Sequence, residues 1–485
     1  MKRNLFFLLG IIVFLLSSCT MAPKYTRPAS PVPADWPTGA AYNETKSVTS
    51  VPVAAELPWR EFITDERLQK VIETALKKNR DLRVAVLNVE GARALYGIQR
   101  AELLPSINAA GIWDKEHVPA DLSSTGYAVT SEQYGVNLGI TSWEIDFFGR
   151  IRSLKDQALE EYLSTEDALR SAQIMLVSSV AQAYLSLAAD REALKIVAST
   201  LEAQETSYKL IKKRCDVGLS SELDLRRAQS QVDTARVDVA RYTQLAAQDE
   251  NALNLLVGSP LQQELMPVDL GSVSPPREVS AGLSSESLLG RPDVLAAEHR
   301  LKAANANIGA ARAAFFPRIS LTTAIGTASA DLSGLFKSGQ GTWGFTPQII
   351  MPIFDARTWS AYDVTKVEKE ISVAQYEKAI QTAFREVADA LAIKGTINQQ
   401  IAAQQSLVEA VAETYRLSNA RYTKGIDSYL AVLDAQRSLY AAQQGLIMLH
   451  LSRFVNQVTF YNVLGGGALK FKDNDRLLKN LISFF

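Results

Sequence analysis

Four short segments of the chain alternate, with a period of two residues, between apolar side chains and small or polar ones. This alternation predicts strands with two unlike faces at about 104–114, 133–147, 316–328 and 343–354. At 133–147 the apolar set is Tyr134, Val136, Leu138 and Ile140, and the small or polar set is Gly135, Asn137, Gly139 and Thr141. Strands of about ten residues with two such faces suit a transmembrane β-barrel, and a soluble two-layer sheet predicts the same pattern.

Aromatic residues bracket the ends of these strands, at Phe147, Phe148, Phe315, Phe316 and Phe354. An aromatic belt at a membrane interface predicts this placement, and so does a packed junction between strands and helices. Four strands are too few to close a barrel, and an open sheet edge would leave N–H and C=O groups unsatisfied in hydrocarbon. If the strands lie in a membrane, the chain must therefore form an oligomer.

Two long stretches, 149–257 and 356–464, are rich in Ala, Gln and Leu and predict helices. Apolar residues in both stretches step by three and four, which is the seam of a coiled coil. Gly218 and Gly425 each interrupt one stretch and are followed by a segment that is suited to start a new helix. Each stretch is therefore predicted to be a helical hairpin whose tip lies at the glycine.

The chain is duplicated in tandem. Residues from Arg80 to Ile107 match residues from Pro292 to Ile319 at a constant offset, and 214–258 match 421–465 at a second constant offset. Four prolines interrupt residues 259–284, between the copies, and exclude a continuous helix there. This linker is expected beside the helices, about halfway along the rod.

These patterns predict a mixed α+β membrane protein with an internal tandem repeat. Each repeat supplies a helix, two strands and a long helical hairpin. The predicted order is a signal peptide at 1–18, a Pro-rich N-terminal segment at 19–58, the first repeat at 59–258, the linker at 259–284, the second repeat at 285–465 and a tail at 466–485.

The N-terminus reads as an export signal. A basic start is followed by an apolar run at 5–16, which is too short to span a bilayer. The run ends in Leu-Ser-Ser-Cys at Cys19, which resembles the lipobox of bacterial lipoproteins, and this predicts diacylglyceryl and N-acyl lipid on Cys19. An ordinary signal peptide with a cysteine near its end is the alternative. Thr20, where lipoproteins retained at the inner membrane commonly have Asp, favours the outer membrane.

Composition and charge narrow the function classes. The 485 residues include 51 Lys and Arg against 52 Asp and Glu, with a formal net charge of −1, so nothing indicates a nucleic-acid partner. The three histidines, His117, His299 and His450, lack metal-ligand spacing. The sequence has no P-loop and no Gly-x-Ser-x-Gly turn. We therefore expect neither an enzyme nor a bound cofactor or metal, and the driving energy for any transport must come from a partner.

Together these features resemble the outer-membrane efflux factor family, the TolC-like channels, and most closely the OprM-like lipoprotein branch of multidrug efflux pumps. The lipobox and the stretches 79–85, 309–317 and 421–437 carry the resemblance, which spans nearly the whole chain. It implies a homotrimer with one twelve-stranded barrel in the outer membrane and a tapering periplasmic tunnel of twelve helices. It also implies a periplasmic membrane-fusion adaptor and an inner-membrane pump, commonly proton-driven, with the chain as passive exit duct for drugs and other toxic small molecules.

The resemblance also places Leu430, Asp434 and Arg437 at the constriction where such channels close, at the periplasmic helix tips. These positions are four and three residues apart and share one helix face just after Gly425. In a trimer, three Asp434 carboxylates would ring the axis while Leu430 narrows the pore. A solvated surface ion pair is the simpler interpretation of Asp434 and Arg437.

The two copies differ on this helix face. The positions that match Asp434 and Arg437 in the first copy are Arg227 and Ser230. Only the second hairpin is therefore expected to carry an acidic ring.

Two other function classes stay open on the residues alone. An export duct for secreted proteins shares the predicted architecture and differs in its inner-membrane partner. A lipid-anchored periplasmic coiled-coil scaffold accounts for the helices but leaves the four alternating segments unexplained.

Overall fold

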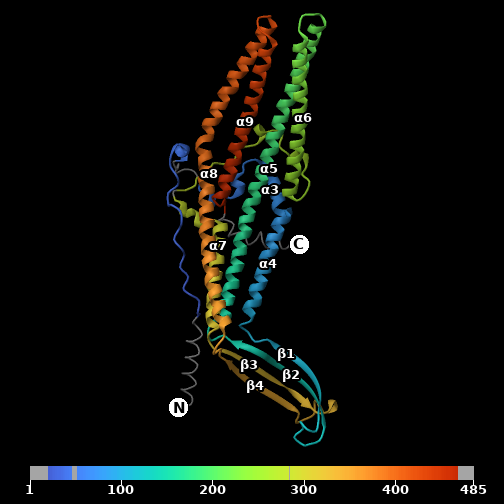
Figure 1. Ribbon diagram of the computed structural model, residues 1–485, viewed down its shortest axis with the longest axis vertical. Coiled ribbons are helices and arrows are strands. Elements are labelled where there is room, and N and C mark those ends of the chain that lie inside the picture. Colours follow the sequence, from blue (N-terminus) through green and yellow to red (C-terminus); the bar gives the residue numbers. More distant parts are fainter. Residues whose placement is uncertain (1–19, 46–51, 283, 468–485) are drawn as a thin grey trace. The chain divides into compact units, whose positions relative to one another are not determined.

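The computed structural model describes residues 20–45, 52–282 and 284–467. It is mostly helical and contains one four-stranded sheet, as Figure 1 shows. The predicted signal peptide, the predicted lipidation site Cys19 and most of the predicted tail lie outside the described residues.

The elements follow one another in the order helix, two strands, helical hairpin, and this order occurs twice. Their bounds are α2 Trp59–Phe62, α3 Glu66–Lys78, α4 Arg80–Ala101, β1 Ile107–Val118, β2 Val129–Ile145, α5 Arg150–Asp216, α6 Glu222–Val257, α7 Pro292–Ala313, β3 Arg318–Ser329, β4 Gly341–Ile350, α8 Ala356–Thr423 and α9 Tyr429–Val463.

The chain divides into two compact units, and four long helices have residues in both. The first unit contains the sheet and the adjoining parts of α4, α5, α7 and α8, within residues 1–29, 89–165 and 297–376. The second unit contains the helical hairpins and the linker, within residues 30–88, 166–296 and 377–485. The units are described separately below.

The sheet of the first unit is antiparallel, with the strand order β1-β2-β3-β4. The two hairpin loops, 119–128 and 330–340, lie at one end of the strands, which we call the loop end (Figure 1). The helices that precede and follow the strands begin or finish at the other end, the helix end. The strand pair of each repeat is thus a hairpin, and β2 pairs with β3 to join the two repeats in one sheet.

The register separates the sheet into two unlike faces, because successive side chains of a strand point to opposite sides. The apolar face carries Ile107, Ala109, Trp113, Tyr134, Val136, Leu138, Ile140, Trp143, Ile145, Ile319, Leu321, Ile325, Trp343, Phe345 and Ile349. The small face carries Asn108, Ala110, Gly135, Asn137, Gly139, Ser320, Thr322, Ala324, Gly326, Gly344, Thr346 and Gln348.

A β-bulge keeps the apolar face continuous along β2. Ile140 pairs with Thr323 and Trp143 pairs with Leu321, so β2 has one residue more than β3 over this interval. Ser142 has a φ of 53°, and its N–H donates to the Thr322 hydroxyl at 3.2 Å. Without the extra residue Trp143 would change sides, because a one-residue shift exchanges the faces of a strand.

Aromatic rings fill the junction between strands and helices. Phe148 stacks on Phe316 at 5.0 Å between ring centroids, and Phe315 meets the edge of Trp359 at 4.8 Å. Phe354 is 89% exposed. The rings of Phe148, Phe315 and Phe316 therefore form a packed junction, which is one of the two predicted roles, and Phe354 lies on the surface. The aromatic belt at a membrane interface stays a prediction.

The N-terminal segment lies against α7 in the first unit. The Thr20 and Ser153 hydroxyls are 3.2 Å apart, and the Asn305 amide donates to the Pro23 carbonyl at 2.7 Å. The Arg27 guanidinium makes two hydrogen bonds, of 3.0 and 2.6 Å, to the Glu298 carboxylate, which is almost fully buried. Gly309 permits this approach, because a Cβ there would lie 2.6 Å from the Ala22 nitrogen.

The helical hairpins of the second unit close at glycines with left-handed backbone. Gly218 has a φ of 76° and Gly425 a φ of 72°, so each ends its helix in a conformation that glycine adopts without strain. At about 1.5 Å per residue the 67 residues of α5 extend for about 100 Å, whereas the 36 residues of α6 extend for about 54 Å.

Several boundaries differ from the sequence prediction for physical reasons. The strand expected at 104–114 runs from Ile107 to Val118, because the chain first makes a turn in which the Leu104 N–H donates to the Ala101 carbonyl. The strand expected at 343–354 ends at Ile350, ahead of Pro352. The linker contains two short 3-10 helices, Gln263–Leu265 and Leu270–Ser272, and a third, Ser285–Gly290, begins the second repeat.

Candidate functional site

The apolar face of the sheet is open to the surroundings of the single chain. Ala109, Leu138, Ile325 and Trp343 form one row across the four strands. In that row Leu138 is 52%, Ile325 68% and Trp343 82% exposed. An uncovered apolar face of this extent predicts contact with lipid or with another protein.

Two glycines of the small face allow β2 and β3 to approach each other closely. A Cβ added to Gly139 would lie 2.3 Å from the Thr323 carbonyl oxygen, and one added to Gly326 would lie 2.1 Å from the Val136 carbonyl oxygen. A sheet that curls toward this side would place its small and polar residues inside a barrel and its apolar residues outside.

The apolar face has an outer limit near the loop end. The rings of Trp113 and Tyr134 stack there at 6.3 Å, and the next residues toward the loops on this face, Lys115 and Glu132, form an ion pair. From Tyr134 to Ile145, β2 covers about 35 Å at about 3.4 Å per residue, which a tilt of about 40° reduces to about 27 Å. This height matches the apolar band of an outer-membrane barrel.

A helical membrane span does not offer an equally good account. Among the described residues α5 alone contains a helical window long and apolar enough to cross a membrane, and 61% of that window is buried inside the protein. Such burial is what a core helix of a helical bundle shows. The sheet is therefore the membrane element that the exposure pattern supports.

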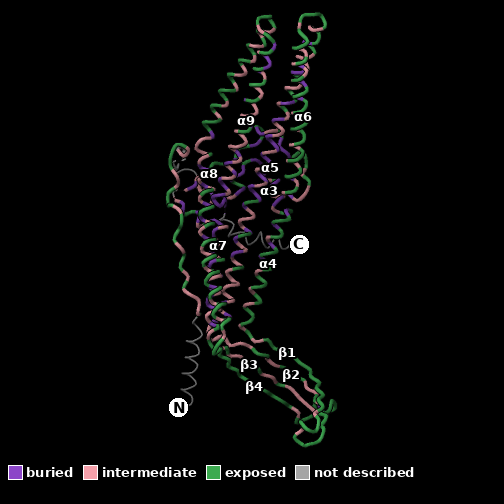
Figure 2. Tube along the Cα trace, in the orientation of Figure 1, coloured by how far each residue is buried: buried purple, intermediate pink, exposed green. Residues whose placement is uncertain are grey.

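The two edge strands have a free side within this chain. β1 pairs only with β2, and β4 pairs only with β3. Figure 2 shows both edge strands in the exposed class along nearly their whole length. Each edge therefore presents unpaired backbone groups to a further strand.

Two helices beside the edge strands expose apolar stripes. On α4, which leads into β1, the stripe consists of Val84, Leu87, Leu95 and Ile98, each more than half exposed. On α8, which follows β4, it consists of Val364, Val367 and Ile371, each more than half exposed. The spacing of three and four residues puts each set on one helix face. In chain order, the stripe on α4 precedes the edge strand β1, and the stripe on α8 follows the edge strand β4.

At the tips, a small core joins the two helical hairpins of the second unit. Its buried members come from α5, α6 and α9, and are Ile211, Ala228, Tyr429, Val432 and Leu433. The Arg214 guanidinium lies 5.2 Å from the centre of the Tyr422 ring, which adds a cation–π contact between the hairpins. Burial raises the pKa of Tyr429 to about 12, so its hydroxyl stays neutral at physiological pH.

The predicted gate residues lie on α9 but outside this core. Leu430 is 42% exposed, and Asp434 and Arg437 are exposed and form an ion pair with each other. The core residues of α9 are Tyr429, which directly precedes Leu430, and Val432 and Leu433, which lie between Leu430 and Asp434 in the sequence. The structure therefore brings together, on one exposed face of α9, Leu430, Asp434 and Arg437. The ion-pair interpretation and the gate interpretation both expect this placement.

The two tips use different caps. In the first, the Ser221 hydroxyl accepts from the Asp224 N–H at 3.1 Å, and Asp224 pairs with Arg227 at 3.8 Å. In the second, Ser428 makes no side-chain cap, and Arg421 pairs with Asp427 across the turn. The position equivalent to Asp434 in the first copy thus carries Arg227, which is paired with Asp224, whereas Asp434 itself is paired with Arg437.

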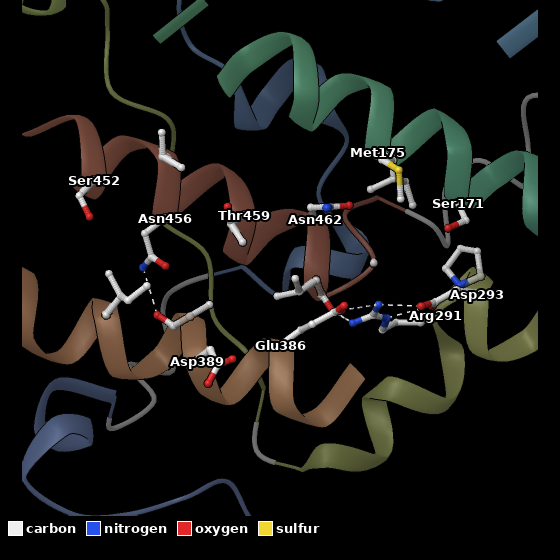
Figure 3. A pocket seen from close by; sticks show the side chains of 17 residues that line it. Ser171, Met175, Arg291, Asp293, Glu386, Asp389, Ser452, Asn456, Thr459 and Asn462 are labelled. Atoms are coloured by element: carbon white, nitrogen blue, oxygen red, sulfur yellow. Dashed lines mark hydrogen bonds and ion pairs between the residues drawn. The ribbon is translucent and has the colours of Figure 1, made fainter. Parts of the chain in front are cut away.

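A cavity of about 530 Å³ lies in the second unit, between α5, α8, α9 and the start of α7. Figure 3 shows the Arg291 guanidinium at its wall, where it bonds to Asp293 at 2.7 and 3.0 Å and to Glu386 at 2.9 Å. The same guanidinium donates to the Val463 carbonyl at 2.7 Å. All charges of this cluster are paired with each other, so its geometry indicates a clamp that joins three helices.

Sequence reasoning missed several of these groups. The Trp113 and Tyr134 pair, the stripes on α4 and α8 and the Arg291 cluster depend on pairing and packing that only the fold reveals. The stripe on α4 has helical spacing in the sequence and could have been found, but spacing alone does not tell a buried stripe from an exposed one. The described residues contain no group of His, Cys, Asp and Glu that could hold a metal ion.

Comparison with known proteins agrees with this geometry. Residues 71–259 and 283–466 match the model of a family described as outer membrane efflux protein. An antibiotic efflux pump outer membrane protein and a toluene efflux pump outer membrane protein, both of Pseudomonas putida, are each 49% identical to this chain over 461 residues, which are 95% of this chain and of each relative. The open state of the MtrE outer membrane channel of Neisseria gonorrhoeae has a TM-score of 0.83 and 37% identity, and the match covers 93% of this chain and 99% of that one.

Proposed function

Because the chain belongs to the outer membrane efflux protein family and acts as the outer-membrane component of an efflux pump, we propose that three copies close one duct around a common axis. The observation that carries the proposal is the open four-stranded sheet with one apolar face. In hydrocarbon the free sides of β1 and β4 must pair, and β4 of one copy can pair with β1 of the next. Since each chain contributes an even number of strands, every new pair is again antiparallel.

The number of copies follows from the lumen that a duct needs. One chain cannot close, and two chains would give eight strands, whose interior is just wide enough for side chains. Three chains give twelve strands and an open lumen. The small side chains on the small face support this assignment, because they would leave the lumen free.

The helical stripes support the same head-to-tail contact. The stripe on α4 continues the edge at β1, and the stripe on α8 continues the edge at β4. When β4 of one copy meets β1 of the next, these apolar stripes come together as well. The contact is heterologous, and such contacts form rings when the rotation between copies closes.

In the proposed orientation the helices lie in the periplasm, and Cys19 carries the lipid. Thr20, which follows Cys19 directly, contacts Ser153 in the first turn of α5, close to the helix end of β2. A lipid chain on Cys19 would thus enter the bilayer leaflet beside the helix end of the sheet. In a bacterial outer membrane this is the periplasmic leaflet, so the helices begin on the periplasmic side of the membrane.

The partners and cargo follow from the family and from the relatives. A duct without its own energy source needs an inner-membrane pump, for which proton drive is the common form, and a periplasmic adaptor that contacts both. The Pseudomonas putida relatives are described as antibiotic and toluene efflux components. We expect this chain to export the same class of small toxic compounds, and the relatives favour this over an export duct for proteins or a periplasmic scaffold.

The closed end of the duct is the second hairpin tip. Around a threefold axis the free face of α9 would present three copies of Leu430, Asp434 and Arg437. The exposure of this face supports the assignment, because the core beneath it is complete without these side chains. Leu430 would narrow the opening, and Asp434 would set the charge at the opening.

The oligomer is tested by mutating one stripe. Wild-type protein should run as a heat-modifiable, detergent-dependent trimer and open channels in planar bilayers. Leu95→Glu should abolish the trimer band, because the stripe would then carry a charge into an apolar contact. Arg93→Glu, on the opposite exposed face of α4, is the matched control and should retain the trimer. A wild-type monomer without channel activity would overturn the proposal, as would a stable Leu95→Glu trimer.

A further inference from the structure

Among the described residues, the charged side chains of the small face lie at its two ends only. Strand alternation assigns four of them to this face, namely Asp114 and Glu116 toward the loop end and Glu144 and Arg318 at the helix end. Between these ends the face carries Gly, Ala, Ser, Thr, Asn, Gln and Ile side chains. A lumen built on this face would therefore have a neutral middle and two charged rims.

At the helix end the carboxylate is already neutralised. The Arg150 guanidinium binds Glu144 with two hydrogen bonds of 2.8 and 2.9 Å, and the side chain of Glu144 is only 10% exposed. Arg318 reaches the same carboxylate, and 62% of its side chain stays exposed. The Glu144 carboxylate thus faces two guanidinium groups, and the more exposed of the two, that of Arg318, lies on the small face. The next pair, Asp146 with Arg152, is neutral, and Glu102, also near Arg150, lies before β1 and outside the sheet.

At the loop end the carboxylates of the small face have no such partner among the described residues. Asp114 lies opposite Gln133 and Glu116 lies opposite Ser131, both uncharged. The neighbouring Lys115 points to the other face, where it pairs with Glu132. Sheet geometry thus separates Lys115 from the two acids on either side of it in sequence.

We propose that Arg318 and the pair Asp114 and Glu116 form two oppositely charged rings that select solutes by charge in the barrel lumen. The proposal rests on the trimer above, which would place three arginines at the periplasmic rim and six carboxylates at the outer rim. Cations are concentrated at the outer rim and repelled at the inner rim, and anions behave in the opposite way, because charges at the wall of a low-dielectric channel focus the field into it. Neutral compounds pass both rings without a barrier of charge.

The test is the reversal potential of single channels in planar bilayers under a tenfold KCl gradient. All variants carry Asp434→Ala and Arg437→Ala, so that the helix tips do not set the selectivity. Arg318→Gln should raise the ratio of K⁺ to Cl⁻ permeability by about twofold or more, and Asp114→Asn with Glu116→Gln should lower it by about as much. The controls are Lys115→Gln, which removes a positive charge from the apolar face, and Glu132→Gln, which removes a negative one there. Both should leave the permeability ratio unchanged.

Each outcome bears on one statement. Shifts of opposite sign in the two small-face variants, with unchanged controls, support the two rings. An unchanged ratio in both small-face variants overturns them, and so does an equal shift in the controls. If the wild-type protein forms neither trimers nor channels, the proposed function fails and not the assignment of the rings.

A second measurement covers the case in which a variant does not assemble. Arg318→Cys in a Cys215→Ser background leaves one cysteine in the mature chain besides Cys19, since Cys215 is a free thiol. A cationic thiosulfonate reagent added to the inserted channel should restore the wild-type ratio, and an anionic one should move the ratio further toward cations. Equal effects of both reagents would count against a charge ring at Arg318.

Discussion

Asn79 and Arg291 stand at equivalent positions of the two repeats and make the same hydrogen bond. The Asn79 amide donates to the Leu256 carbonyl at 2.8 Å, and the Arg291 guanidinium donates to the Val463 carbonyl at 2.7 Å. Each residue precedes the helix that leads to the strands, and each acceptor lies in the last turn of a hairpin helix. The duplicated fold thus retains a clamp whose chemistry has changed from an amide to a guanidinium.

Arg291→Met should destabilise the second unit more than Asn79→Ala does. Loss of Arg291 leaves Glu386 and the Val463 carbonyl without their partner, and breaking such a buried pair typically costs about 3 kcal/mol. Loss of Asn79 removes a helix cap and one hydrogen bond, which costs about 2 kcal/mol. Thermal unfolding followed by circular dichroism in detergent measures both.

The control for this comparison is an exposed ion pair. Arg60 pairs with Glu73 at 3.0 Å, and 64% of its side chain is exposed. Arg60→Met should change the free energy of unfolding by less than about 1 kcal/mol. If Arg291→Met had no larger effect than Arg60→Met, the clamp would have no structural importance.

Two glycines with the same backbone conformation should respond differently to a methyl group. Gly258 and Gly218 have φ values of 77° and 76°. A Cβ on Gly258 would lie 2.4 Å from the Lys78 carbonyl oxygen, whereas one on Gly218 would meet nothing within 4 Å. Gly218→Ala should therefore cost about 1 kcal/mol of backbone strain, and Gly258→Ala should cost more and lower the melting temperature further. Equal losses would show that the approach to Lys78 relaxes freely.

Replacing Asp434 and Arg437 by Ala should raise single-channel conductance in planar bilayers. The ion pair and its side chains would no longer narrow the opening that the second hairpin tip is proposed to close. Arg227→Ala with Ser230→Ala, at the equivalent positions of α6, is the matched control and should leave conductance as in wild type. Unchanged conductance in the first variant would remove the gate assignment.

Asp249→Asn should stabilise the protein at high pH and not at low pH. Burial, and then the neighbouring Asp190 carboxylate, raise the pKa of Asp249 from 3.8 to about 6. The stability that protonated Asp249 contributes is fully present below pH 3.8 and is lost as the pH rises through about 6. An amide at this position cannot ionise, so it avoids that loss.

The measurement is the difference in unfolding temperature between Asp249→Asn and wild type from pH 4 to pH 8. The difference should be positive at pH 8 and decline toward zero near pH 4. Asp233→Asn, which changes an exposed carboxylate of the same helix, should show no such trend. A difference that is independent of pH would show that the pKa of Asp249 is not raised in the folded protein.

The sequence predicts the local elements better than the relations between them. The faces of 133–147 are correct at Val136 and Leu138, because alternation within one strand is a local property. The bulge at Ser142 was not predicted, since an extra residue becomes visible only against the partner strand. The break between α3 and α4 at Asn79 was also missed. Comparing the two repeats did not reveal it, because the residue equivalent to Asn79 in the second repeat is Arg291, which differs in chemistry.

The gate positions show the same limit. Helical spacing predicts that Leu430, Asp434 and Arg437 share one face, and the structure exposes all three. Whether that face lies at the threefold axis of the proposed trimer depends on neighbouring copies of the chain. Neither the spacing of residues nor the structure of one chain describes those copies. In the proposed ring, the free sides of β1 and β4 would determine where those copies attach.

Tandem duplication also has a consequence for how this duct can diversify. A ring of six copies of one single-hairpin chain would receive every substitution six times, so a single acid would place six charges at its narrow end. In a ring of three duplicated chains, a substitution in one repeat alters every second position and leaves the alternate hairpin as it was. One half of the ring can therefore drift toward tighter or looser closure while the other half maintains the wall.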